Sequence, residues 1–293
     1  MLVSMKEMLA DARAKHYALP AFDISNYDMM KSVLEACEEE HSPALLMALG
    51  VDLQGRDMNL IASMVRSASD YFHIPVCLHL DHATNMELIQ KAVEAGFSSV
   101  MYDGSVLDFE NNARNTAEVT KYAHAHGITV EAELGHVGNA SVGSISETGN
   151  DTDPGESLTV PEEVAKFVDI THVDALAVAI GTAHGKYKGE PKLDFDRLAE
   201  IRKALEAAGV SIPLVLHGAS GLTDESVREC IAQGICKVNF ATELRQAYSA
   251  GVKEVLAKDP DVYDPKKYGK VAMAKVQALV EDRIKVCGCN GKA

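Results

Sequence analysis

Short apolar runs alternate along the chain with longer segments in which apolar residues recur at helical spacing. This alternation is typical of parallel strands joined by helical crossovers. Eight of the runs have the length and composition of buried strands, and eight is the number that a (β/α)₈ TIM barrel, an α/β fold, requires. The expected strands cover residues 18–23, 43–49, 75–81, 98–103, 128–134, 175–181, 213–218 and 237–241.

The segments between the runs carry the signals of amphipathic helices. One such segment starts at Asn85 and stops at Gly96, a glycine of the kind that ends helices, and another runs from Asp194 to Leu205. After Thr242 the chain stays helical, with an interruption at 263–269. We therefore expect one barrel domain over residues 1–293, with a C-terminal helical extension that covers the barrel or a neighbouring subunit.

Length and charge narrow the class of protein. Although 293 residues could hold two domains, a single α/β barrel commonly takes about 250 residues. The chain carries 43 acidic and 28 basic residues, and a net charge of -15 argues against nucleic acid or an anionic membrane as its main partner. Charges interrupt the N-terminal apolar residues, and no apolar run approaches the ~20 residues of a membrane span, so we expect a cytoplasmic protein.

Six cysteines are scattered through the chain, which favours reduced thiols over a disulfide framework. Cys287 and Cys289 form a Cys-x-Cys pair that could bind a metal. A bare pair near a terminus is weak support for a metal site, and inert packing is the preferred interpretation.

Polar residues gather where several expected strands end. His79-Leu-Asp81-His82 closes one run, while His184 and His217 follow two others. The carboxyl ends of barrel strands meet on one face, so three histidines and an aspartate should converge there. Three neutral imidazoles with an open fourth position suit a catalytic zinc ion. The pattern predicts a metal-dependent enzyme.

The longest irregular stretch covers residues 135–157 and is rich in Gly, Ser, Asn, Asp and Thr. It follows the expected strand that carries Glu131 and Glu133. Long loops in compact domains are often functional, so we interpret it as a mobile active-site loop, with a solvated surface excursion as the alternative.

Five motifs, in this order, resemble those of the class II ketose-bisphosphate aldolases, and the similarity extends over nearly the whole chain. In the tail, Tyr263-Asp-Pro-Lys-Lys-Tyr and Ile284-Lys-Val-Cys-Gly resemble the tagatose- and fructose-bisphosphate aldolases. The five motifs are His79-Leu-Asp-His82, Val130-Glu-Ala-Glu-Leu-Gly135, Ala179-Ile-Gly-Thr-Ala-His-Gly185, Leu216-His-Gly-Ala-Ser220 and Lys237-Val-Asn-Phe-Ala-Thr-Glu243.

The resemblance implies roles for single residues. His82, His184 and His217 would hold the catalytic zinc, and Asp81 would exchange the proton of the hydroxyl at the bond that breaks. His79 shares a strand face with Asp81 and would support it without binding metal. The seven other histidines have no matching role and are expected at the surface or in packing: His16, His41, His73, His124, His126, His136 and His172.

Further positions match a second metal site and a phosphate cradle. Asp103 and Glu133 would either bind a second metal or a monovalent cation, or orient the zinc ligands by hydrogen bonds. The cradle would hold dihydroxyacetone phosphate through backbone donors and hydroxyls at helix N-termini. Its matching positions are Gly185, Gly218, Ala219, Ser220, Asn239, Phe240, Ala241 and Thr242.

Several departures from the family pattern concern the far end of the substrate. Asp23 stands where the bisphosphate aldolases usually carry asparagine, and Ala48 where the fructose enzymes carry a serine for the distal phosphate. The 135–157 loop lacks the family's acidic pattern with its proton-abstracting glutamate, for which Glu147 is a substitute of uncertain alignment. Arg283, or Lys266 with Lys267, could reach a neighbouring subunit and restore distal phosphate binding.

These observations predict a zinc-dependent aldolase that reversibly releases dihydroxyacetone phosphate from a phosphorylated ketose, with tagatose or fructose 1,6-bisphosphate as the first candidates. A ketose 1-phosphate with an unphosphorylated distal end is weighed almost equally. A metal-dependent sugar-phosphate epimerase or isomerase, and a sugar-phosphate binding protein without catalysis, are the alternatives from other classes. The resemblance also implies a homo-oligomer, either a homodimer or a homotetramer.

Overall fold

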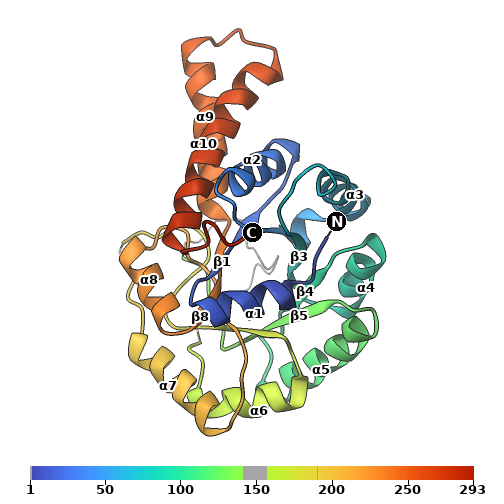
Figure 1. Cartoon of the computed structure of the whole chain (residues 1–293), viewed down its shortest axis with the longest axis vertical. Helices are drawn as coiled ribbons and strands as arrows, with labels where there is room; N and C mark the ends of the chain where they lie inside the picture. Colours follow the sequence, from blue (N-terminus) through green and yellow to red (C-terminus); the bar gives the residue numbers. More distant parts are fainter. Residues whose placement is uncertain (1, 141–156, 190) are drawn as a thin grey trace.

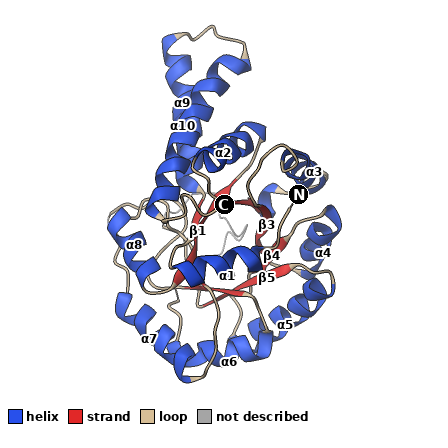
Figure 2. Ribbon diagram, viewed as in Figure 1, coloured by secondary structure: helices blue, strands red, loops and turns tan. Residues whose placement is uncertain are grey.

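Eight parallel strands form a closed barrel in the computed structural model, which describes residues 2–140, 157–189 and 191–293. Each strand pairs with the next along the chain, and β8 pairs with β1. Figure 2 shows the strands at the centre of a ring of helices. The strands are β1 (Leu19–Asp23), β2 (Ala44–Leu49), β3 (Val76–Ala83), β4 (Ser99–Tyr102), β5 (Thr129–Leu134), β6 (Ala175–Val178), β7 (Leu214–Leu216) and β8 (Ile235–Phe240).

Helices follow the strands and cover the outside of the barrel (Figure 1). Both faces of every strand are therefore buried, which explains why strands such as β2 and β6 are continuous apolar runs. Strands β3 and β5 differ, because buried polar residues alternate there with apolar ones. The helices are α1 (Met5–Lys15), α2 (Tyr27–Glu39), the 3₁₀ turn η1 (Gly50–Asp52), α3 (Asp57–Ala68), α4 (Met86–Ala95), α5 (Phe109–Ala125), α6 (Pro161–Thr171), α7 (Phe195–Ala207), α8 (Asp224–Ala232), α9 (Thr242–Lys258) and α10 (Pro265–Val286).

The structure confirms the barrel and its eight expected strands. It also confirms the helix signals: the Asn85 side chain accepts a hydrogen bond from the Leu88 backbone at the start of α4, and Gly96 ends that helix with φ 95°. The sixth strand is shorter than expected, because it ends at Val178 and not at Gly181. Gly181 has φ 102°, so the chain has already left the extended conformation there.

Two helical segments complete the barrel. At the N-terminal ends of the strands, the Val3 backbone N–H donates to the carbonyl of Val76, and the hydroxyls of Ser4 and Thr129 lie 2.8 Å apart, so α1 closes this end. At the C-terminus, α9 and α10 pack against each other and α10 packs on α2, while their far ends project away from the barrel (Figure 1). None of the described helices is long and apolar enough to span a membrane.

Candidate metal and catalytic site

Three buried histidines meet at the C-terminal end of the barrel. His82 comes from the end of β3, His184 from the segment after β6, and His217 directly follows β7. The ring centroid of His82 lies 4.8 Å from those of both His184 and His217. One nitrogen from each ring lies within 4.8 Å of the others, a spacing at which a single metal ion could contact all three. The structure thus brings together the three histidines that the sequence singled out.

Asp81 and His82 are neighbours in the chain, yet both reach this cluster. Successive strand residues normally point to opposite faces. Asp81 keeps the strand register beside Leu49, whereas His82 has φ 48° and the register shifts between Leu80 and Ala83. A non-glycine residue in this left-handed region is uncommon and is held there by its surroundings. The irregular backbone turns the His82 ring toward the same space that Asp81 faces.

The Asp81 carboxylate is buried beside several hydrogen-bond donors. The side-chain amide of Asn239 lies 3.3 Å from both carboxylate oxygens, and Nε2 of His79 lies 3.7 Å from one of them. Burial would raise the pKa of Asp81, but the positive His82 nearby and the close His79 imidazole outweigh it and hold the pKa well below its usual range. Asp81 is therefore an ionised carboxylate that can accept a proton.

Carboxylates surround two of the histidines. Nδ1 of His82 lies 2.8 Å from Asp103, while the two ring nitrogens of His217 lie 2.9 Å from Glu133 and from Glu131. Burial would lower the pKa of His217, but the hydrogen bonds to both glutamates raise it to about 9. Burial would likewise lower the pKa of His82, but the negative charges of Asp81 and Asp103 raise it to about 10. Without a bound metal ion, both rings are therefore protonated at neutral pH.

His184 differs from the other two histidines in its charge. Burial, followed by the positive charges of His82 and His217, lowers the pKa of His184 to about 3, so its ring is neutral. Its backbone is held by the described start of the 135–157 loop: the His184 N–H donates to the Gly138 carbonyl, and the His184 carbonyl accepts from the Ala140 N–H. Residues 141–156, including Glu147 and most of the expected active-site loop, lie outside the described residues.

A buried ion pair inside the barrel was not predicted as part of the site. Lys237 and Glu131 are both fully buried, and the lysine Nζ lies 2.9 Å from Oε2 of Glu131. The lysine and the hydrogen bond from His217 overcome the effect of burial and lower the pKa of Glu131 to about 2. The available signal was a charged residue inside each of two expected strands, because such residues are rarely buried unless paired.

Tyr187 connects the two segments that carry His184 and His217. Its hydroxyl accepts a hydrogen bond from the Ala183 N–H and donates one to the Gly218 carbonyl, both at 2.7 Å. The segments also touch directly, since a Cβ on Gly218 would lie 2.6 Å from the Ala183 carbonyl oxygen. Gly218 has φ 65°, so this position requires glycine for two reasons. These contacts fix the separation of the two histidines.

The positions expected to form a phosphate cradle lie at the end of β8 and on the segments that follow β6, β7 and β8. The Ser220 hydroxyl accepts a hydrogen bond from the Glu243 N–H at 3.3 Å, which joins the segment after β7 to the first turn of α9. Gly185, Ala219, Ala241 and Thr242 belong to the same segments after β6, β7 and β8. Phe240 is fully buried and its ring stacks on Phe22 at 6.1 Å, so only its backbone is available to a ligand.

Two expected placements differ in the structure, and a third agrees with the expectation. Ala48 pairs with Leu80 and faces the helices, whereas Leu49 pairs with Asp81 and faces the site. Arg283 is only 9% exposed, and it pairs with Asp224 at 2.8 Å within its own chain, so it is not available to a neighbouring subunit. Lys266 and Lys267 stay exposed at the start of α10.

One histidine expected in packing lies at the edge of the cluster. His136 is buried, with Nδ1 2.8 Å from the Ser105 hydroxyl and 3.9 Å from Glu133. Cys287 and Cys289 are buried free thiols, and they are absent from the metal-compatible groups among the described residues. The Asp103 and Glu133 carboxylates do form such a group with His82.

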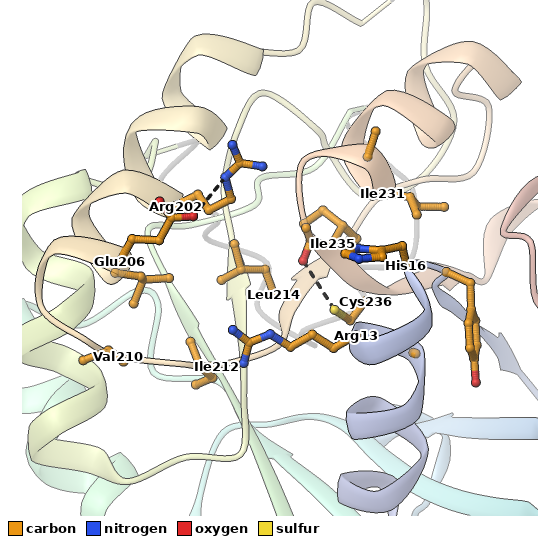
Figure 3. Close-up of a pocket in the computed structure, with 15 residues that line it drawn as sticks. Arg13, His16, Arg202, Glu206, Val210, Ile212, Leu214, Ile231, Ile235 and Cys236 are labelled. Atoms are coloured by element: carbon orange, nitrogen blue, oxygen red, sulfur yellow. Dashed lines mark hydrogen bonds and ion pairs between the residues drawn. The ribbon is translucent and has the colours of Figure 1, made fainter.

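A separate cavity of about 280 Å³ opens at the opposite end of the barrel (Figure 3). Arg13 of α1 and His16, which follows that helix, face the first residues of β7 and β8, Leu214 and Ile235, across it. Its lining contains none of the clustered histidines. Barrel enzymes carry their active sites at the C-terminal ends of the strands, so the histidine cluster is the candidate catalytic site.

Comparisons with known proteins show which family the chain belongs to. The family model for class II fructose-bisphosphate aldolase matches residues 3–292. The YdjI aldolase of Escherichia coli K12 is 35% identical, with complete coverage of both chains and a TM-score of 0.85. A putative fructose-1,6-bisphosphate aldolase of Coccidioides immitis is 30% identical over 98% of this chain and 96% of its own, with a TM-score of 0.84.

The fructose-bisphosphate aldolase Fba of Campylobacter jejuni is 23% identical and covers 100% of this chain and 97% of its own. Its TM-score of 0.84 shows that the two proteins share the fold. The family match over nearly the whole chain and the two more similar structures give the same result: the chain belongs to the class II fructose-bisphosphate aldolase family and is an aldolase, a carbon–carbon lyase.

Proposed function

We propose that residues 1–293 form one barrel domain that uses zinc to cleave a phosphorylated ketose reversibly into dihydroxyacetone phosphate and an aldehyde. The observation that carries this proposal is the meeting of His82, His184 and His217 beside the ionised carboxylate of Asp81. Epimerases and binding proteins could also use a metal and a phosphate cradle. Family membership favours cleavage of a carbon–carbon bond.

The chemistry of the cluster fits a divalent cation. Nε2 of His82 is buried and has no hydrogen-bond partner among the described residues, although a buried polar atom normally has one. Metal ligands must also lose their protons. A divalent cation that replaced one proton on His82 and one on His217 would leave the net charge of the cluster unchanged. The surrounding carboxylates, which stabilise the protonated rings in the metal-free site, would then stabilise the ion.

Three imidazoles are a typical ligand set for a catalytic zinc ion, which we assign to His82, His184 and His217. When bound, zinc acts as a Lewis acid toward the negative charge that develops on the substrate oxygens. Asp103 is hydrogen-bonded to Nδ1 of His82, and Glu131 to Nε2 of His217. Carboxylates often orient metal-binding imidazole rings in this way, through the ring nitrogen that does not bind the metal. Asp103 and Glu133 could instead hold a second metal or a monovalent cation with His82.

Asp81 is the proposed acid and base at the bond that breaks. In cleavage its carboxylate takes the proton of the C4 hydroxyl, and in condensation the protonated carboxyl returns it to the aldehyde oxygen. The Asn239 amide, 3.3 Å from both oxygens, holds the carboxylate in a fixed orientation.

The proposed cradle would hold the phosphate of dihydroxyacetone phosphate at the start of α9. The N-terminus of a helix offers free backbone N–H groups and a positive dipole end, which suit an anion. Gly185, Gly218, Ala219 and Ser220 would contribute from the segments after β6 and β7. Asn239, Phe240, Ala241 and Thr242 would contribute from the end of β8 and the first residue of α9.

Fructose and tagatose 1,6-bisphosphate are the first candidate substrates by family membership. A specific observation favours a second candidate, a ketose 1-phosphate: Asp23 and Leu49, not asparagine and a hydroxyl, face the site from β1 and β2. A carboxylate and an apolar side chain provide no hydrogen-bond donor for a distal phosphate.

The deciding assay is release of triose phosphate from both bisphosphates and from the matching ketose 1-phosphates. A chelator should abolish release and added zinc should restore it. Interconversion of ketoses without triose release would support an epimerase. Tight substrate binding without turnover by the zinc-loaded protein would support a binding protein.

Tyr187→Phe is expected to weaken zinc binding by about tenfold, the lower end of the effect of removing a group that orients metal ligands. The variant keeps the ring and removes only the hydroxyl that joins Ala183 to Gly218. Zinc affinity is measured by competition with a chromophoric chelator. Tyr263→Phe, at a tyrosine that is 93% exposed, is the matched control. Equal affinity of both variants would show that Tyr187 does not position the ligands.

A further inference from the structure

A guanidinium group is held between two carboxylates near the C-terminal ends of β1 and β2. Arg245 lies in the first turn of α9, and its Nε donates to Oδ2 of Asp23 at 2.7 Å. One of its terminal nitrogens donates to Oδ2 of Asp52 in η1 at 2.5 Å. The Asp23 side chain is fully buried, whereas those of Arg245 and Asp52 are 30% and 32% exposed. We call these three residues the arginine clamp.

Strand register places the clamp at the mouth of the barrel. Asp23 pairs with Met47, which in turn pairs with His79, so Asp23 points to the barrel axis as His79 does. The turn that carries Asp52 also touches the site, because a Cβ on Gly50 would lie only 3.5 Å from the His82 carbonyl oxygen. The clamp therefore lies on the β8, β1 and β2 side of the candidate site.

The charges of the clamp do not favour a phosphate. One guanidinium faces two carboxylates, so the three side chains together carry a net negative charge. The guanidinium already donates to both carboxylates, and a phosphate could use it only by competing with them. The partly exposed edge of the pair offers N–H donors of Arg245 and a carboxylate acceptor of Asp52. A hydroxyl, which both donates and accepts, matches this edge.

We propose that the arginine clamp determines specificity for the distal end of the ketose, by disfavouring a phosphate there and favouring an uncharged polyhydroxyl chain. This inference rests on the proposed aldolase function and narrows its substrate class to ketose 1-phosphates. In the direction of condensation, the preferred partner of dihydroxyacetone phosphate is then an unphosphorylated hydroxyaldehyde.

The test compares D-glyceraldehyde with D-glyceraldehyde 3-phosphate as partners of dihydroxyacetone phosphate in condensation by the zinc-loaded protein. The two aldehydes differ only in the phosphate. The wild type should have the higher kcat/KM with glyceraldehyde. In Asp23→Asn/Asp52→Asn the ratio should move toward the phosphorylated aldehyde by about tenfold or more, mainly through KM, because two negative charges are gone and the guanidinium is released.

Two further variants control this comparison. Asp259→Asn/Asp261→Asn removes the same charge from exposed positions after α9 and should leave the ratio unchanged. Asp52→Asn alone keeps the buried Asp23–Arg245 pair, so it should fold normally and shift the ratio in the same direction by a smaller amount. A wild type that prefers the phosphorylated aldehyde, or an unchanged ratio in both clamp variants, would overturn the inference.

Failure of the clamp can be separated from failure of the proposed function. Exchange of the dihydroxyacetone phosphate carbon-bound hydrogen with deuterated water needs no aldehyde, and it is followed by NMR. If exchange occurs and the clamp variants keep the wild-type ratio, only the clamp is wrong. If the zinc-loaded wild type neither exchanges this hydrogen nor releases triose phosphate, the proposed function fails and the inference fails with it.

Discussion

Asp81→Asn should lower kcat for cleavage by about 10²–10⁴-fold, the usual contribution of a positioned acid or base. The amide occupies the same volume but cannot take the proton of the substrate hydroxyl. Zinc content should be unchanged, because the three imidazoles that we assign as ligands remain. The measurements are single-turnover release of triose phosphate and zinc by mass spectrometry.

Asp174→Asn is the matched control for this variant. Asp174 is also a largely buried aspartate with several hydrogen bonds, but it lies directly before β6, at the N-terminal end of the barrel. It should lose some stability and keep its kcat. If Asp81→Asn kept the wild-type kcat, Asp81 would not be the acid and base of the reaction. If that variant lost zinc, Asp81 would instead be a metal ligand.

His184→Ala and His217→Ala should both lose zinc and cleavage, but they should differ in the stability of the metal-free protein. His184 is a neutral ring, so its removal leaves no charge without a partner. His217 is positively charged and lies between Glu131 and Glu133. Its loss should destabilise the metal-free fold by about 3 kcal/mol or more, as for other buried ion pairs that lose one partner.

Urea unfolding of the metal-free proteins measures this difference, and His16→Ala serves as a control at an exposed histidine. The comparison separates the two roles of His217, as a proposed ligand and as the counter-ion of two glutamates. Full zinc occupancy in His184→Ala would contradict the assigned ligand set. Equal stability of the two metal-free variants would contradict the charge that we assign to His217.

The fold was predictable from sequence because barrel strands are buried on both faces. Most of the strands are therefore short apolar runs, and the helices between them show clear start and stop residues such as Asn85 and Gly96. Polar residues stand out at the ends of such runs. That contrast identified Asp81, His82, His184 and His217 before their geometry was known.

The details of the site were less predictable because they depend on register and on local backbone. An alternating strand would turn His82 away from Asp81, and only its left-handed φ of 48° brings the two together. The strand register likewise makes Leu49, and not its neighbour Ala48, the β2 residue that faces the site. The family resemblance gives motif positions, but it does not fix register within a strand.

The arginine clamp could not be found from sequence at all. Asp23 and Arg245 are separated by 222 positions in the chain, and no local pattern pairs an arginine in the first turn of a helix with a carboxylate in a distant strand. They meet because β8 returns to pair with β1 when the barrel closes. The Lys237–Glu131 pair gives a weaker signal in the sequence, as charged residues inside expected strands.

The clamp and the histidine cluster share no residue, although they lie at the same end of the barrel. Changes at sites that share no partner usually act additively on free energy, so a substitution in the clamp should leave the affinity for the metal unchanged. A lineage of aldolases could therefore acquire a new aldehyde through one or two substitutions in β1 or η1, without passing through an inactive ancestor. The residue at position 23 should therefore differ between related aldolases that act on different aldehydes.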